Sequence, residues 1–267
     1  MRWSVVIPYY NEASGIEATL RCAGEQMGEA FRLILIDNAS TDGSEAVCRR
    51  VMADYPHVEV EYLREARPGQ VHALKRGLDA VRTELVAIWD ADTLYPRHYL
   101  RQAALCFDRG GPEVAAVMAW LDKGGEGTVR RQLSRVHRLV VSQLWPWQNH
   151  TSGPAQTFRT AALRAAGGYD PAIWPFVIKD HELVNRVLKH GRQVYHPQLW
   201  CRSSDRRKDR SNVRWTLWER LVYHLHPSRS RDWFFNDYLK PRFVARGQLD
   251  TKLRERAWEA AARVASA

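Results

Sequence analysis

Two carboxylates separated by a single residue have the spacing that most directly indicates a chemical role in this chain. Asp90, Ala91 and Asp92 follow the apolar run LVAIW at once, so both side chains can face one crevice where the chain turns. Mg²⁺ and Mn²⁺ are often held by one or two carboxylates together with substrate phosphates. A metal bound there would stabilise the charge that builds on a departing diphosphate. The alternative interpretation is a solvated turn, where Asp is common.

A second polar pair follows another apolar run. Asp37 and Asn38 come at the end of LILID, and the Asn amide offers both a donor and an acceptor to the edge of a nucleobase. Asp42 or Ser44 can cap the helix that follows, which gives the later part of this stretch a structural role. Base binding and a structural turn both remain open for Asp37 and Asn38.

The elements that must position these residues alternate between strand and helix. Apolar runs predict strands at 4–8, 33–37, 58–63, 85–89 and 114–119, and helical spacing predicts helices at 12–26, 44–55, 71–81 and 96–108. This order is typical of a doubly wound α/β fold with a mostly parallel sheet and helices on both faces. Functional residues in such sheets collect at the carboxyl ends of the strands, so we expect one shared crevice.

The second half of the chain is less regular, and the charge is concentrated near its end. We expect an amphipathic helix at 129–144, a loop at 145–157 and helices at 160–166 and 180–190. The formal net charge is +10, and residues 202–256 contribute 15 Lys/Arg against 7 Asp/Glu. Nine aromatic residues accompany twelve Lys/Arg between positions 200 and 246. This basic, aromatic segment therefore needs its own explanation.

Six stretches, taken together and in order, resemble the family 2 glycosyltransferases of the GT-A fold. They are VVIPYYNE at 5–12, LIDNASTDGS at 35–44, GQVHALKRGLDAV at 69–81, VAIWDADTLYP at 86–96, FRTAALRAAGGYD at 158–170 and KDHELVNRVLKHG at 179–191. The resemblance implies a Rossmann-like GT-A domain over 1–200, with a nucleotide-sugar half to about 120 and an acceptor half over 121–200. Residues 201–267 would form a helical C-terminal extension.

The resemblance implies transfer of one sugar, of the hexosyltransferase type, from a nucleotide-diphosphate donor to an acceptor hydroxyl with inversion. It also assigns the donor site. Pro8, Tyr10 and Glu12 would line the nucleotide pocket, with Asp37 or Asn38 at the base. Asp90 and Ala91 would lie at the ribose, and Asp90 and Asp92 would bind Mn²⁺ or Mg²⁺. Arg67 and Lys75 would reach the phosphates or remain plain surface charges. UDP is the expected nucleotide, with GDP and dTDP as alternatives.

Asp180 matters most for the mechanism that the resemblance implies. Family members usually have Glu-Asp at the start of this helix, with the Asp as catalytic base, and this chain has Lys179 and Asp180. A single displacement needs a base opposite the leaving diphosphate to accept the acceptor's proton. The alternative is that Asp180 only caps its helix. Glu182 is the reserve candidate for the base.

The acceptor site is less sharply defined by the sequence. We expect Gly153 and its loop, Trp174, His181 and Glu182 to shape it, with Trp174 either stacking on a sugar face or buried in the core. His196, His224 and His226 are weak candidates for a further metal ligand and have structural roles as the alternative. The pair Arg206-Arg207 resembles an S-x-R-R element that may serve the diphosphate in some family members.

The identity of the acceptor and the role of the C-terminal segment stay open at this stage. A lipid-linked or a small-molecule acceptor is compatible with the sequence. The basic, aromatic segment predicts a helix that covers the sheet or forms a homodimer contact, or else docks on an anionic membrane. Two other functions compete: a nucleotidyltransferase and a basic nucleic-acid-binding protein. The acidic clusters at the strand ends argue against nucleic acid, and no Gly-rich phosphate loop follows the first strand.

The cellular location is predicted from the cysteines and the apolar windows. Four widely spaced cysteines, Cys22, Cys48, Cys106 and Cys201, indicate free thiols in a reducing cytosol. The sequence begins on a strand pattern with no secretory leader, and no window approaches the roughly 18 apolar residues of a spanning helix. We therefore expect a cytoplasmic protein, or one peripheral at the inner face of the membrane. Since the Q-x-x-R-W signature of processive family members is absent, we expect one sugar per event.

Overall fold

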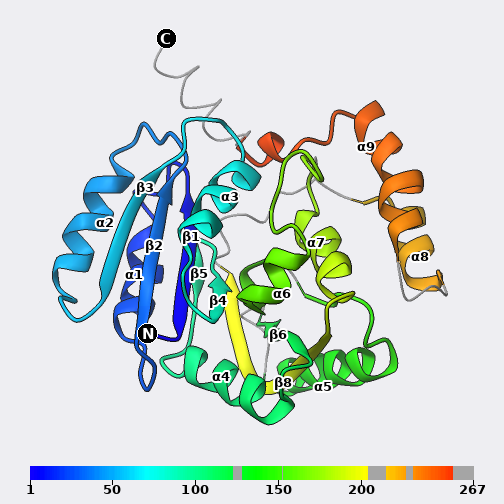
Figure 1. Ribbon diagram of the computed structural model, residues 1–267, viewed down its shortest axis with the longest axis horizontal. Coiled ribbons are helices and arrows are strands. Elements are labelled where there is room, and N and C mark those ends of the chain that lie inside the picture. The colour runs from blue at the N-terminus through cyan, green and yellow to red at the C-terminus, as the bar shows by residue number, and fades with distance from the viewer. Residues whose placement is uncertain (123–127, 152, 204–214, 227–230, 255–267) are drawn as a thin grey trace.

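A computed structural model of the protein describes residues 1–122, 128–151, 153–203, 215–226 and 231–254 (Figure 1). The first half contains β1 (Trp3–Tyr9), α1 (Ile16–Gly24), β2 (Phe31–Asp37), α2 (Ser44–Ala53), β3 (Glu59–Arg64), α3 (Gln70–Ala80), β4 (Leu85–Ile88), β5 (Thr93–Leu94), α4 (Tyr99–Gly110) and β6 (Val114–Leu121). The second half contains α5 (Thr128–Leu144), the 3-10 turn η1 (Gly153–Ala155), β7 (Gln156–Arg159), α6 (Thr160–Ala165), α7 (Lys179–Val187), β8 (Arg192–Ser203), α8 (Leu217–Leu225), the π-helical η3 (Trp233–Leu239), α9 (Lys240–Ala245) and the 3-10 segment η4 (Asp250–Arg254).

The strands form one sheet in the order β3-β2-β1-β4-β7-β6-β8-β5. β1 pairs in parallel with β2 and β4, β2 with β3, and β6 with β8. β7 is antiparallel to both β4 and β6, so β4 and β6 run in the same direction and their carboxyl ends share one edge. The expected doubly wound, mostly parallel α/β sheet is confirmed.

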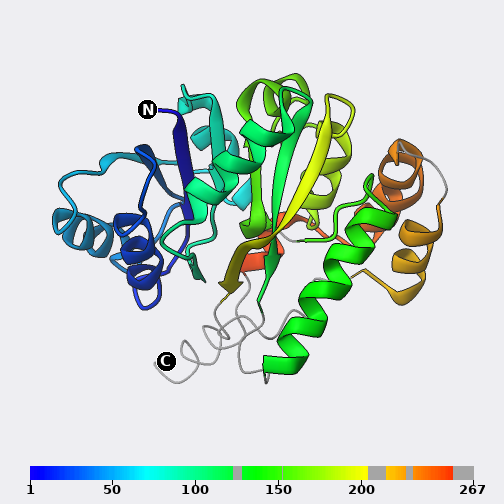
Figure 2. The same cartoon turned by 90° about the horizontal axis from the view of Figure 1, so that it is seen from below.

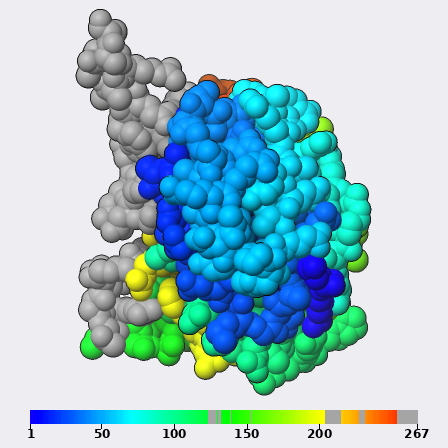
Figure 3. Space-filling view, turned by 90° about the vertical axis from the view of Figure 1, so that its left-hand side faces the viewer, coloured from blue at the N-terminus to red at the C-terminus, as the bar shows by residue number. Residues whose placement is uncertain are grey.

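Helices cover both faces of the sheet, and alternate residues of the central strands feed two cores. In β1, Val5 and Ile7 pack with α1, α2 and α4, whereas Val6 packs on the other face with α3, α6 and α7. All three residues are fully buried, as the alternation of side chains along a strand between two covered faces requires. Figure 3 shows the surface of the N-terminal half, where α2 and the elements next to it form a continuous face.

Three strands were not predicted from the sequence. β7 carries Gln156 and Thr157, which are polar but fully buried, so its pattern did not indicate a strand. β8 contains Pro197, and its register against β6 shifts between Met118 and Trp120, so it lacks a continuous apolar run. β5 has only two residues. The expected loop at 145–157 therefore ends in a turn and the start of a central strand.

The C-terminal segment packs on the region that precedes α7. A third, aromatic core joins Trp174 and Phe176 to residues of α8, η3 and α9. Phe176 forms a β-bridge with Leu249, and the backbone N–H of Asp250 donates to Pro175 O (3.0 Å). The predicted boundary after residue 200 falls inside β8, and the division into a domain and an extension remains a prediction.

The side chain of Asp250 reaches the other half of the chain. Its Oδ2 accepts a hydrogen bond from the N–H of Val71 in the first turn of α3 (2.8 Å). Gly69, just before α3, has φ +122°, and a Cβ there would lie 2.9 Å from Asp250 Oδ1. Glycine is therefore needed both for the backbone conformation and for the close approach.

Within the described ranges, no helix has the length and apolar character to cross a membrane.

Candidate active site

The loops that follow β1, β2 and β4 meet at the shared carboxyl edge of the sheet. The N–H of Asn38, after β2, donates to Tyr9 O at the end of β1 (2.9 Å). The N–H of Trp89, after β4, donates to Val6 O of β1 (3.0 Å). The expected convergence of these three strand ends is therefore present. Pro8 is buried within β1 beside this edge, and Tyr10 is partly exposed on it.

The β1 and β2 loops are joined through polar side chains. Asn11 donates its N–H to Ser40 Oγ (3.1 Å), and its Oδ1 accepts from Thr41 N (2.8 Å). The N–H of Glu12 donates to Ser44 Oγ (2.8 Å), and Glu12 is only 1% exposed. Ser44 thus serves this junction, although it also begins α2.

Strained backbone marks the loops of the candidate site. In the described part of the chain, the non-glycine residues with positive φ are Asn11 (50°), Ala39 (60°) and Ile178 (65°). They lie in the loop after β1, in the loop after β2, and at the N-cap of α7 just before Asp180. Such conformations are costly for residues other than Gly, above all for β-branched Ile178, and they concentrate at functional sites.

Asp37 and Asn38 have different roles in the structure. Asp37 is 4% exposed, and its Oδ1 accepts from Ser40 N (2.9 Å). The Asn38 amide donates to the backbone carbonyls of Glu65 (3.1 Å) and Arg67 (2.8 Å). Its carbonyl oxygen accepts the N–H of Gly69 (3.1 Å). The Asn38 side chain therefore holds the loop that enters α3, which supports the structural alternative, and a contact with a nucleobase stays a prediction.

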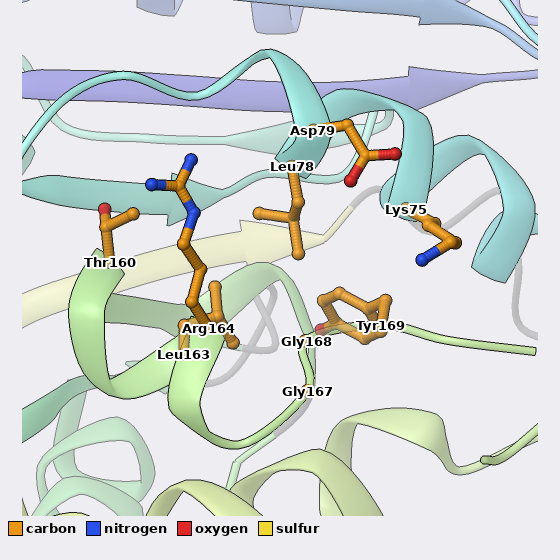
Figure 4. A pocket seen from close by; sticks show the side chains of 9 residues that line it. All are labelled: Lys75, Leu78, Asp79, Thr160, Leu163, Arg164, Gly167, Gly168 and Tyr169. Carbon is orange, nitrogen blue, oxygen red and sulfur yellow. The ribbon is translucent and has the colours of Figure 1, made fainter.

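The two cations expected at the phosphates have partners elsewhere. Arg67 donates from Nε to Glu65 Oε1 (2.9 Å), and this guanidinium lowers the pKa of the Glu65 carboxyl. Lys75 Nζ donates to Asp170 Oδ2 (3.1 Å). Lys75 borders a hollow of about 240 Å³ between α3 and α6. Figure 4 shows Lys75, Leu78 and Asp79 on one side of it and Thr160, Leu163 and Arg164 on the other.

Tyr95 fixes the turn that carries the paired carboxylates. Its hydroxyl accepts the N–H of Asp90 (3.1 Å) and donates to Pro154 O (3.0 Å). Its ring is stacked on Trp89 with centroids 3.7 Å apart. Since Pro154 belongs to the η1 turn, the hydroxyl connects the Asp90 turn to the loop before β7. Gly153, the predicted acceptor residue, lies next to Pro154 in this turn.

The rest of the Asp90–Asp92 turn is held from α1 and α3. Thr19 Oγ1 lies 3.0 Å from Ala91 O and 2.9 Å from Thr93 O, and it accepts the N–H of Thr93 (3.1 Å). Gln70, in the first turn of α3, donates to Asp90 Oδ1 (3.2 Å). Asp92 is 7% exposed. The alternative interpretation required a solvated turn. The structure instead holds this turn by hydrogen bonds from α1, α3 and Tyr95.

Asp180 enters the same site from α7. It is the second residue of that helix, and Ile178 occupies the N-cap position, so Asp180 is not the capping residue. A Cβ on Gly153 would lie 3.8 Å from the Cβ of Asp180, and Gln156 donates to Asp180 O (3.5 Å). Gly153 therefore leaves space beside the half-buried Asp180.

The pKa of the Tyr169 phenol responds to two of the acidic groups, Asp180 and Asp90. The phenol is buried, and burial is the main reason that its pKa is raised well above the usual value. The negative charges of Asp180 and Asp90 raise it further. Both carboxylates are therefore within electrostatic reach of one hydroxyl, although they are 90 residues apart in the sequence.

The paired carboxylates fit a metal that is shared with the substrate. In the described residues, no group of three His, Cys, Asp or Glu side chains is placed to hold an ion. Asp90 and Asp92 supply hard oxygen donors on a turn fixed by Tyr95 and Thr19, and Mg²⁺ or Mn²⁺ commonly completes its shell with substrate phosphates and water. The residues therefore fit a metal that binds together with a diphosphate.

The three histidines considered as further ligands make other contacts. His196 Nδ1 accepts the N–H of Gln198 (3.2 Å), and His224 Nδ1 lies 3.0 Å from Gln148 Oε1. His226 is stacked on Trp233. Arg206 and Arg207 lie outside the described residues.

Two of the predicted acceptor residues, Trp174 and His181, serve the packing of the C-terminal half. Trp174 is 2% exposed, donates from Nε1 to Val177 O (3.0 Å) and packs on Phe235, so of the two alternatives the structure has Trp174 buried in the core rather than open to a sugar. The His181 ring packs edge-on against Trp215. Both residues therefore pack in the aromatic core. The positions of these residues in the sequence could not predict this packing.

Glu182 is committed to an ion pair. Its carboxylate accepts two hydrogen bonds from Arg186, from Nε (2.7 Å) and from Nη2 (2.8 Å), and it is 4% exposed. Arg186 also donates to the carbonyls of Ala166 and Gly168. This arrangement argues against Glu182 as the reserve base and leaves Asp180 as the candidate.

Sequence reasoning missed three residues that organise the site. Tyr95 lies in the same VAIWDADTLYP stretch as the paired carboxylates, and its place three residues after Asp92 could have drawn attention to it. Tyr169 follows the Gly167-Gly168 turn but carried no chemical motif. Asp250 had no local signal, because its contact with α3 joins residues 179 positions apart.

Comparisons with known proteins identify the family of this chain. The model of glycosyl transferase family 2 matches residues 4–166. An uncharacterized glycosyltransferase, alr2836, from Nostoc is 29% identical over 65% of this chain and 56% of its own length. An undecaprenyl-phosphate 4-deoxy-4-formamido-L-arabinose transferase from Salmonella paratyphi A is 26% identical over 67% of this chain and 52% of its own length. The matched region thus spans about half the length of these relatives.

Solved structures agree with the fold. The mannosyltransferase PcManGT from Pyrobaculum calidifontis, in complex with GDP-Man and Mn²⁺, superimposes with a TM-score of 0.67 at 25% identity, covering 90% of this chain and 68% of that one. TarS from S. aureus, in complex with UDP-GlcNAc, gives a TM-score of 0.62 at 15% identity, covering 91% and 73%. The fold is therefore GT-A, and the chain belongs to glycosyl transferase family 2.

Proposed function

We propose that this chain is a glycosyltransferase that moves one sugar per event, with inversion, from a nucleotide-diphosphate donor to an acceptor hydroxyl, and that Asp180 is the general base. The observation that carries the proposal is that the Tyr95 hydroxyl links the Asp90 turn to the η1 turn, in which Gly153 lies beside Asp180. One carboxylate belongs to the turn that suits a metal-bound diphosphate, and the other lies on the α7 side of the same site. This is the separation of roles that a single displacement requires.

Different residues of the site would bind the donor and activate the acceptor. Asp37 and the loops of Tyr10 and Glu12 form the nucleotide side of the edge, and Asp90 and Asp92 hold the diphosphate side. A divalent ion bound there would neutralise charge on the leaving group. Asp180, beside the space left by Gly153, would accept the proton of the attacking hydroxyl.

The donor and the acceptor are inferred from relatives. PcManGT is described with GDP-Man and TarS with UDP-GlcNAc, so UDP and GDP are the nucleotides to test first and dTDP follows. The Salmonella relative is named for undecaprenyl-phosphate, which favours a lipid-linked acceptor over a small molecule. The family match supports sugar transfer over the nucleotidyltransferase and nucleic-acid alternatives. The cytoplasmic location and a homodimer through the C-terminal helices remain predictions.

The test combines a binding screen with single turnover. Thermal shift with UDP-, GDP-, CDP- and dTDP-sugars and Mn²⁺ identifies the donor, because a bound ligand stabilises the fold. With that donor, Asp180→Asn is expected to keep the thermal shift but to lose transfer by about 100-fold or more. The control is Asp54→Asn, an exposed residue just after α2, which should leave both unchanged. Near-normal transfer by Asp180→Asn would exclude Asp180 as the base.

A further inference from the structure

The first turn of α3 has no capping group in its own part of the chain. Gly69 at the N-cap has no side chain to offer, and the first turn contains no Asp or Glu. The first N–H groups of an α-helix have no partner within the helix and need an acceptor. Asp250 supplies one from the other end of the chain, because its carboxylate accepts the N–H of Val71 (2.8 Å) and the residue is 5% exposed. A carboxylate at this place also suits the positive end of the helix dipole.

Gln70 lies between two backbone positions that are held by side chains. On one side, Gly69 donates its N–H to Asn38 Oδ1 (3.1 Å). On the other side, Val71 donates its N–H to Asp250. The carboxylate of Asp250 also lies against Gly69, where a Cβ would come 2.9 Å and 3.0 Å from its two oxygens. The backbone that carries Gln70 is therefore fixed both from the loop after β2 and from the C-terminal segment.

From this fixed backbone, the Gln70 side chain reaches one of the paired carboxylates. Its amide donates to Asp90 Oδ1 (3.2 Å). A carboxylate that binds a metal is usually oriented by hydrogen bonds from residues that do not touch the metal themselves. Loss of such a partner commonly costs about 10- to 100-fold in metal affinity. Gln70 is therefore placed to orient Asp90 toward a metal-bound diphosphate.

Asp250 is itself fixed on the part of the chain that leads to α7. Its N–H donates to Pro175 O (3.0 Å), and the neighbouring Leu249 forms a β-bridge with Phe176. Figure 2 shows the red C-terminal segment leaving α9 and returning to the middle of the molecule, and Figure 1 shows η4 close to α3. Asp250 therefore joins the start of α3 to the segment that precedes α7.

We propose that Asp250 is a positioning residue for the donor site and acts on Asp90 through Gln70 and the first turn of α3. This role rests on the proposed function, because Asp90 matters here as a ligand of the metal-bound diphosphate. The C-terminal segment then serves the donor site, although it lies beyond residues 4–166, which match the family model. A purely structural cap would stabilise α3 without changing how tightly the chain binds a nucleotide.

The test is calorimetric titration of the full chain with UDP and with GDP, each with and without Mn²⁺. Gln70→Leu should bind the nucleotide about tenfold more weakly when Mn²⁺ is present, because Asp90 loses this hydrogen bond. Asp250→Ala should show a loss of similar size. Asp250→Asn should bind within about threefold of the parent chain, since Asn keeps an acceptor for the N–H of Val71. The double variant Gln70→Leu/Asp250→Ala should lose no more than about tenfold, whereas independent effects would multiply to about a hundredfold.

The matched control is Thr216→Ala, which removes the acceptor for an N–H in the first turn of α8, also in the C-terminal segment. It should lower the free energy of unfolding about as much as Asp250→Ala does, but it should bind both nucleotides like the parent chain. The proposal is overturned if Asp250→Ala binds as tightly as Thr216→Ala, or if the losses of the two single variants multiply in the double variant. Absence of Mn²⁺-dependent binding by the parent chain would instead refute the proposed function, and the role of Asp250 with it.

Discussion

Replacing Tyr95 by Phe tests the hydrogen bonds of its hydroxyl at the candidate site separately from the packing of its ring. The Tyr95 hydroxyl accepts from Asp90 N (3.1 Å) and donates to Pro154 O (3.0 Å), and the residue is 4% exposed. Phe keeps the ring on Trp89 and leaves no cavity. It removes both hydrogen bonds and leaves a backbone N–H and a backbone carbonyl without this partner.

The magnitude follows from these two groups. Each hydrogen bond contributes about 1 kcal/mol net, and leaving a buried group unsatisfied costs about 1–3 kcal/mol. The free energy of unfolding should therefore fall by roughly 2–4 kcal/mol. The turn of Asp90 and Asp92 also loses its link to the η1 turn, so we expect kcat/KM to fall by about tenfold or more, since displaced catalytic groups lose rate steeply.

Tyr99 provides the matched control for this experiment. It packs edge-on against Trp89 and Tyr95, and its buried hydroxyl has no hydrogen-bond partner in the described structure. Tyr99→Phe should leave the free energy of unfolding unchanged or raise it slightly, and kcat/KM should stay the same. Urea unfolding and steady-state kinetics on both variants are the assays. Equal losses in the two variants would refute the linking role of the Tyr95 hydroxyl.

Three further predictions concern stability and are each read by urea unfolding. Glu182→Gln should cost about 3 kcal/mol, because it breaks a buried ion pair and leaves Arg186 uncompensated; an unchanged free energy of unfolding would contradict the pairing. Asp250→Ala should cost about 1 kcal/mol, since the N–H of Val71 loses its acceptor at the start of α3, and a neutral effect would show that water replaces it. Burial lowers the pKa of His181 below 6.5, so the unfolded state takes up the proton first and stability should fall as the pH drops from 7 to 5; His181→Phe should show a smaller fall, and an equal one would exclude His181 as a source.

The strand–helix alternation of the first half could be predicted because its strands are continuous apolar runs buried on both faces. β7 and β8 could not, because Gln156 and Thr157 are buried polar residues and Pro197 interrupts β8. Hydrophobic pattern carries no information on polar groups whose hydrogen bonds are made only in the folded sheet. Thr157, for example, donates from its hydroxyl to Val117 O (2.7 Å) on β6.

The carboxylates of the candidate site could be predicted from motifs, but the partners of their neighbours could not. The sequence left open whether Trp174 stacks on a sugar or is buried, and in the structure it packs on Phe235, which lies 61 positions later in the chain. It also left open whether Asn38 binds a base or supports a turn, and in the structure its amide holds the backbone of residues 65–69. In both cases the deciding contact is long-range and leaves no trace in local spacing.

Calorimetric titration of the donor nucleotide, with and without Mn²⁺, addresses the metal-bound diphosphate most directly. The parent chain and Asp180→Asn should both bind UDP or GDP much more tightly when Mn²⁺ is present, since Asp180 acts on the acceptor. Asp92→Ala should lose that dependence on Mn²⁺ and bind weakly in both conditions. Metal-dependent binding by Asp92→Ala with the affinity of the parent chain would show that the turn after β4 does not hold the ion.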